Sequence, residues 1–110
     1  MDQNIKKQWV EALRSGKYEQ GKDWLQNEGK FCCLGVLCDL HAKAKDNNWS
    51  QLYDDVKGYL DHSEFLPEEV VDWADLFSSD PYVGAKKISW YNDAKNFNFD
   101  QIANLIDEYF

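Results

Sequence analysis

The feature that most constrains the fold is an apolar segment between Cys33 and Ala44. On a helix of about 3.6 residues per turn, its apolar side chains cover most of the circumference, and a polar face begins only near Lys43. The main apolar face consists of Leu34, Leu37, Cys38 and His41, flanked by Cys33, Val36 and Leu40. Because a helix with so little polar surface has to be covered on most sides, we expect this segment at the centre of the core.

Amphipathic helices are predicted near both ends of the chain. Residues 3–15 repeat apolar side chains at helical spacing, and Gly16 follows them as a stop signal. Near the other end, Asn98 and Gln101 have the spacing of a capping box that begins a helix. The expected buried stripes are Ile5, Trp9, Ala12 and Leu13 in the first helix and Ile102, Leu105, Ile106 and Tyr109 in the last.

A further helix is predicted to begin at Pro67. Proline suits the first helical position because its ring fixes φ, and Glu68 and Glu69 complement the positive end of the helix dipole. The expected buried stripe is Val70, Trp73, Ala74 and Phe77. The acidic side chains at i, i+4 and i+7 are Glu68, Asp72 and Asp75, with Glu64 nearby. The sequence therefore predicts an acidic helix face.

The remaining segments favour short strands. The sequence Asn27-Glu28-Gly29 is predicted to be the turn of a hairpin that joins residues 20–25 to residues 30–32. Residues 49–60 indicate short strands or irregular structure, and residues 82–88 a short strand leading into a helical turn at 89–94. The expected fold is α+β, a predominantly helical single domain over residues 1–110 with about four helices and one or two short β-hairpins.

The charge of the chain restricts the classes of partner. Twenty acidic residues against twelve basic ones give a net charge of −8, which repels phosphates and anionic lipid headgroups. The first residues lack the pattern of a signal peptide, and the longest apolar stretch is too short to span a bilayer. We therefore expect a cytoplasmic protein without membrane association, for which nucleic acid is a disfavoured partner and a basic protein surface a favoured one.

The three cysteines raise two chemical alternatives. Cys33 stands near a predicted helix start, which lowers a thiol pKa, and a thiol hydrolase would pair it with His62 as the base. A zinc site would combine Cys38 and His41, at i and i+3 on one face, with Cys32 or Cys33 and with or without His62. No second pair of metal ligands follows in the sequence, and buried, reduced cysteines are the preferred interpretation. We accordingly expect no catalytic residue, metal or cofactor.

A helix-turn-helix in the C-terminal third is another alternative. Residues 89–94, a loop at 95–98 and a helix over 99–109 have the required order. A recognition helix presents basic or amide side chains to base edges, whereas this one would expose Asp100, Asp107 and Glu108 and contains no basic residue. DNA binding therefore ranks behind protein binding and behind thiol hydrolysis.

Several segments, taken in order, resemble a group of small proteins. They are WVEALRSG at residues 9–16, YEQG at 18–21, FCCLGVLCDL at 31–40, LPEEVVDWA at 66–74, YND at 91–93 and FDQIA at 99–103. This sequence resembles small proteins of unassigned function from tailed bacteriophages and prophages, over most of its length. The resemblance implies no catalytic residue; it implies the cytoplasm of an infected bacterium, where small acidic phage proteins often bind and block host machinery.

These observations favour a small acidic, non-enzymatic factor that inhibits or modulates a host protein, such as a defence or nucleic-acid-handling protein. The expected acidic contacts are Glu64, Glu68, Asp72 and Asp75. The expected aromatic anchors are Trp49, Tyr53, Tyr59 and Tyr82. These aromatic residues lie in the segments with the least core periodicity, and large rigid side chains dominate the energetics of protein interfaces.

Overall fold

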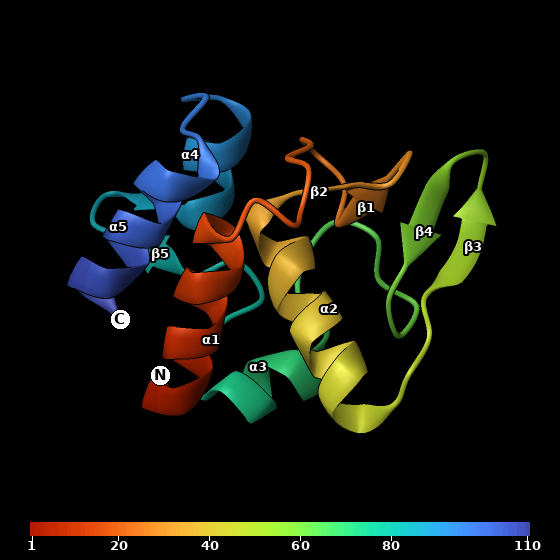
Figure 1. Cartoon of the computed structure of the whole chain (residues 1–110), viewed down its shortest axis with the longest axis horizontal. Coiled ribbons are helices and arrows are strands. Elements are labelled where there is room, and N and C mark those ends of the chain that lie inside the picture. Colours follow the sequence, from red (N-terminus) through yellow and green to blue (C-terminus); the bar gives the residue numbers. More distant parts are fainter.

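The apolar segment forms helix α2 (Cys33–Lys45), which lies in the middle of the computed structural model of residues 1–110 (Figure 1). Eight of its residues are buried, and it contacts α1, α3 and α4. The helix ends where Asp46 adopts a left-handed conformation with φ of 55°. The structure thus confirms that this segment forms the centre of the core.

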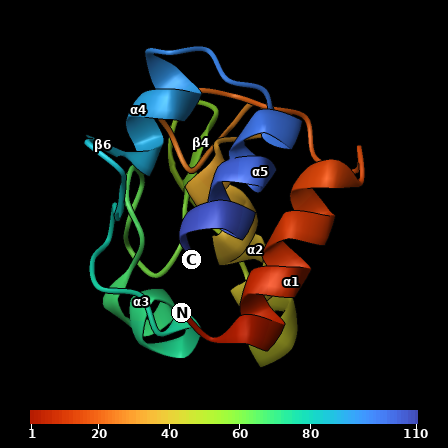
Figure 2. The same cartoon turned by 90° about the vertical axis from the view of Figure 1, so that its left-hand side faces the viewer.

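Helices α1 (Gln3–Arg14) and α5 (Phe99–Tyr109) pack side by side, and α1 also contacts one flank of α2 (Figures 1 and 2). Asp2 caps α1 by accepting a hydrogen bond from the backbone N–H of Ile5 at 3.0 Å. The predicted capping box of α5 is confirmed, since Asn98 and Gln101 each accept the other's backbone N–H, at 2.8 and 2.9 Å. The expectation for Tyr109 is wrong, because this residue is 52% exposed.

A four-stranded antiparallel sheet lies on the other side of α2 (Figure 1). Its strands are β1 (Gln26–Asn27), β2 (Lys30–Phe31), β3 (Ser50–Tyr53) and β4 (Val56–Gly58), in the order β2-β1-β4-β3. Glu28 and Gly29 both have positive φ, 54° and 77°, as the two-residue turn of a tight hairpin requires. The turn is confirmed but the first strand is not residues 20–25, because only Gln20 of that range pairs, in an isolated bridge to Phe31.

Helix α3 (Glu68–Ala74) begins one residue later than predicted. Pro67 is its N-cap, with extended backbone at φ −60° and ψ 153°, and is not the first helical residue. After α3, residues 82–87 form a third hairpin, after β1–β2 and β3–β4, instead of one strand; it consists of β5 (Tyr82–Val83) and β6 (Lys86–Lys87), and α4 (Ile88–Asp93) follows directly. The fold is therefore an α+β domain with five helices where the sequence predicted about four.

Asn92, fully buried on α4, connects three distant segments through its side-chain amide. Its Oδ1 accepts hydrogen bonds from the backbone N–H of Cys33 at 3.2 Å and from Gln20 Nε2 at 3.0 Å. Its Nδ2 donates to the backbone carbonyl of Gly21 at 2.9 Å. The amide thereby fixes the start of α2 and the preceding loop against α4.

One core of 22 buried hydrophobic residues joins the helices. No helix in the structure has both the length and the apolar character needed to cross a membrane.

Candidate protein-binding surface

Helix α3 ends at Asp75, and this ending shapes the surface beside it. Asp75 has left-handed backbone angles, φ 54° and ψ 50°. The N–H of Asp75 donates to the carbonyl of Asp72 at 3.2 Å, and the N–H of Leu76 donates to that of Val71 at 3.0 Å. This is the hydrogen-bond pattern of a Schellman motif, which turns the chain away from the helix axis. Asp75 therefore closes the helix, and the predicted i, i+4, i+7 acidic row does not continue along it.

Phe77 is the most exposed large hydrophobic residue of the chain, with a relative exposure of 102%. Its predicted place in the buried stripe of α3 is wrong, because the helix has already ended at Ala74. The neighbouring Leu76 is half-buried and packs against the core.

An apolar hollow lies on one side of Phe77. It has a volume of about 350 Å³, and nine residues from three parts of the chain line it. They are Met1, Asp75, Leu76, Phe77, Ser78, Pro81, Tyr82, Tyr109 and Phe110. Both ends of the described chain contribute to the wall, and Figure 2 shows them close to α3. Gln3 Nε2 donates to the carbonyls of Met1 at 2.9 Å and Phe110 at 3.2 Å, which holds the two ends together.

An acidic hollow of about 470 Å³ lies on the other side of Phe77. Its lining consists of His62, Leu66, Glu68, Val71, Asp72, Leu76, Phe77 and Ser79. Leu76 and Phe77 thus belong to both hollows and form a ridge between them. No lysine or arginine side chain lines either hollow.

The predicted acidic residues divide between these features. Glu68 and Asp72 lie in the acidic hollow and Asp75 in the apolar one, whereas Glu64 is exposed but lines neither. None of these four carboxylates forms an ion pair within the chain. We name Glu68, Asp72, Asp75 and Phe77 together the α3 surface.

Two of the predicted aromatic anchors belong to the interior. Tyr59 is completely buried, so its predicted exposure is wrong; its hydroxyl lies 2.5 Å from His41 Nδ1 and accepts from Asn47 Nδ2 at 3.2 Å. Trp49 is half-buried and donates from Nε1 to Asp39 at 3.0 Å. Both rings fill space between α2 and the sheet because their polar atoms find partners there.

The other two anchors are exposed but far apart. Tyr53 is 49% exposed on β3, where its ring packs edge-on against Trp24. Tyr82 is 63% exposed on β5 and lines the apolar hollow. Figure 1 places β3 and β5 toward opposite ends of the molecule. Only Tyr82 therefore lies beside the α3 surface.

The buried thiols lack the features of a catalytic nucleophile. All three cysteines are free and buried. Burial raises the pKa of the Cys33 thiol well above its ordinary value, and the nearby Cys32 raises it further. A nucleophilic thiol requires the opposite shift and an adjacent base, yet His62 is exposed at the acidic hollow. The geometry gives no support to the predicted alternative of a Cys33–His62 hydrolase.

His41 on α2 also has a structural environment. His41 is buried between the rings of Tyr59 and Trp73, and burial followed by the charge of Lys45 lowers its pKa. The structure contains no group of three or more His, Cys, Asp and Glu side chains arranged to hold a metal ion. Cys38 and His41 therefore have no third ligand from this chain.

The proposed recognition helix of a helix-turn-helix is α5, and it packs against α1 and α4. Its exposed polar side chains, apart from the Tyr109 hydroxyl at its end, are Asp100, Gln101, Asn104, Asp107 and Glu108. Asp107 pairs with Arg14 of α1 at 3.2 Å. The outer face of α5 is therefore acidic, which disfavours contact with a DNA groove.

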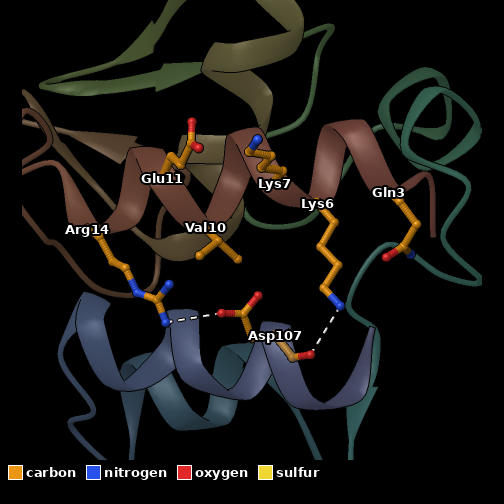
Figure 3. Close-up of a pocket in the computed structure, with 7 residues that line it drawn as sticks. All are labelled: Gln3, Lys6, Lys7, Val10, Glu11, Arg14 and Asp107. Carbon is orange, nitrogen blue, oxygen red and sulfur yellow. Dashed lines mark hydrogen bonds and ion pairs between the residues drawn. The ribbon is translucent and has the colours of Figure 1, made fainter.

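A polar groove of about 350 Å³ separates α1 from α5 (Figure 3). Besides the Arg14–Asp107 pair, Lys6 Nζ donates to the backbone carbonyl of Asp107 at 3.1 Å. Val10 is its single hydrophobic lining residue. Arg14 and Lys6 therefore both link α1 to α5 across this groove.

Comparison with known proteins gives a family but no described relative. Neither a curated protein nor a solved structure matches the chain. A family model described as Domain of unknown function (DUF8296) matches residues 1–110, and the chain belongs to this family.

Proposed function

We propose that the protein is a non-enzymatic binding factor that attaches to a basic surface of another protein through its α3 surface. The observation that carries this proposal is the fully exposed Phe77 beside the unpaired carboxylates of Glu68, Asp72 and Asp75. An exposed aromatic ring flanked by charges of one sign is typical of a docking residue with charges that orient the partner.

Phe77 and the carboxylates of the α3 surface are expected to contribute to binding in different ways. Transfer of a phenylalanine side chain from water into an interface contributes about 1.5–3 kcal/mol. Charges at the edge of an interface mainly raise the association rate and fix the orientation of the partner. Phe77 therefore supplies affinity, and the carboxylates select partners that carry lysine or arginine.

The biological setting that we propose is the cytoplasm of a bacterium infected by a tailed phage. The resemblance of the segments around FCCLGVLCDL to phage proteins supports this setting. The partner is then a host protein with a basic surface, such as a defence or nucleic-acid-handling protein, and attachment blocks that surface. The net charge of −8 favours such a partner.

The experiment is quantitative affinity capture from a bacterial lysate with matched charge-reversal variants. The test variant carries Glu68→Lys and Asp72→Lys, and the control carries Asp100→Lys and Glu108→Lys. Each pair has one residue in the first turn of its helix and one in the last turn, on α3 and α5 respectively. Each pair changes the net charge from −8 to −4, since each reversal adds two charges.

We expect a host protein that the wild type and the control variant both retain and that the test variant loses. Raising the salt concentration should weaken its capture, because screening reduces attraction between exposed charges. Equal loss with both variants would show that only total charge matters. Equal retention with both would refute a role for the α3 surface.

A further inference from the structure

We infer that the α3 surface recognises a segment of its partner that places an apolar side chain in the apolar hollow and a lysine or arginine beside it. This inference rests on the proposed function and specifies the chemistry of the partner. Its basis is the arrangement of the two hollows on either side of Phe77.

The walls of the apolar hollow explain why the partner segment should carry an apolar side chain. Phe77, Tyr82, Tyr109 and Phe110 present aromatic rings, and Leu76 and Pro81 add aliphatic surface. Its volume of about 350 Å³ is near the lower end of the range of roughly 300–1,000 Å³ for pockets that enclose small molecules. A hollow of this size and lining suits one or two apolar side chains of a protein segment.

The charges around Phe77 explain why the partner segment should carry a lysine or arginine. Asp75 lies in the wall of the apolar hollow itself, and Glu68 and Asp72 lie across the ridge. No lysine or arginine side chain lines either hollow and none of the three carboxylates forms an ion pair within the chain, so they lack compensation by a basic side chain there. A cation next to the apolar anchor would supply it, whereas an acidic or purely apolar segment would bury carboxylates without a partner.

The sharing of Leu76 and Phe77 between the hollows fixes how these two requirements combine. A segment that crosses the ridge covers Phe77, fills the apolar hollow on one side and reaches Glu68 and Asp72 on the other. The apolar and basic residues therefore belong to the same short segment of the partner.

A displayed random-peptide library is the probe, selected against the whole protein. We expect the enriched peptides to combine an aromatic or large aliphatic residue with a neighbouring lysine or arginine. Binding of these peptides should weaken about tenfold or more with Phe77→Ser. It should also weaken with Asp75→Asn, since asparagine tolerates the left-handed conformation and removes only the charge.

Tyr53→Ser is the matched control, because Tyr53 is an exposed aromatic residue far from the α3 surface. Binding of the selected peptides should not change with this variant. Because Phe77 is fully exposed, Phe77→Ser should leave the thermal midpoint at that of the wild type, which separates lost binding from lost folding.

Three results would overturn the inference. They are an absence of enriched peptides, enrichment of peptides without basic residues, and enriched peptides that bind Phe77→Ser as well as wild type. Analytical ultracentrifugation adds a fourth: a dimer that Phe77→Ser dissociates would identify the occupant as a second copy of this chain. If any of these occurs while lysate capture still depends on Glu68 and Asp72, the proposed function survives and only the peptide chemistry fails.

Discussion

The substitution Gly35→Ala tests how closely α2 packs against the segment before β1. Gly35 is buried on α2, and a β carbon added to it would lie 1.9 Å from the carbonyl oxygen and 2.7 Å from the carbonyl carbon of Leu25. To restore an ordinary contact of 3.4 Å, the carbonyl would have to move by about 1.5 Å, the difference from 1.9 Å. Leu25 cannot move freely, because it is completely buried and its N–H donates to the carbonyl of Ser63 at 2.7 Å.

The expected loss of stability follows from three contributions. Overpacking a core costs about 1–3 kcal/mol, and weakening the Leu25–Ser63 hydrogen bond adds about 1 kcal/mol. The higher helix propensity of alanine over glycine opposes this loss and stabilises the folded state by about 1 kcal/mol. The free energy of unfolding should therefore fall by about 1–3 kcal/mol, which lowers the thermal midpoint by roughly 5–15 °C in a domain of this size.

Urea unfolding followed by tryptophan fluorescence measures this change, since Trp9 is completely buried in the folded state. Gln8→Gly, at an exposed position within α1, is the control for the helical preference of glycine and should cost about 1 kcal/mol. If Gly35→Ala raised the free energy of unfolding by a similar amount, the helical preference alone would decide the outcome. The close approach of α2 to Leu25 would then be refuted.

Three further predictions concern buried polar groups. Asn92→Ala leaves the Cys33 N–H and the Gly21 carbonyl without their partner, and should lower the free energy of unfolding by about 2–5 kcal/mol in urea titrations. Because burial lowers the pKa of His41 below its ordinary value of 6.5, the unfolded chain takes up a proton that the folded chain resists. The free energy of unfolding should therefore fall as the pH drops below 6.5, and it should fall less steeply for His41→Gln than for the wild type. An equal dependence of this free energy on pH in the two proteins would contradict the prediction. Burial raises the pKa of Cys32 to about 12, so a thiol reagent at neutral pH should label the folded protein slowly and all three cysteines quickly in urea, and fast labelling of folded protein would contradict the burial.

The sequence predicted well those elements whose signals are local. The apolar circumference of Cys33–Ala44 identified the core helix, and the Asn98–Gln101 spacing identified the start of α5, because both depend on residues within one or two turns. The strand β1 was misplaced, because its pairing with β2 and β4 is a tertiary contact that involves only two residues. No local pattern distinguishes such a short strand from the loop before it.

The candidate site was predicted less completely because burial depends on distant partners. Glu68 and Asp72 were predicted as acidic contacts from helical spacing, and the structure places them on the exposed side of α3. Tyr59 was predicted as an anchor because its segment lacked periodicity, yet Tyr59 is buried through contacts with His41 and Asn47. Non-periodic segments can therefore contain core residues, and their aromatic residues cannot be assigned to the surface from the sequence.

The error at Phe77 has a different origin, and it bears on function. Had α3 continued, Phe77 would follow Val70 by seven residues and share its buried stripe. The left-handed turn at Asp75 ends the helix after two turns and directs Phe77 into solvent instead. A phenylalanine whose whole surface stays in contact with water contributes no hydrophobic stabilisation to its own fold. The departure from periodicity therefore falls on a residue that the core does not use, and departures of this kind are expected where a chain serves contacts outside itself.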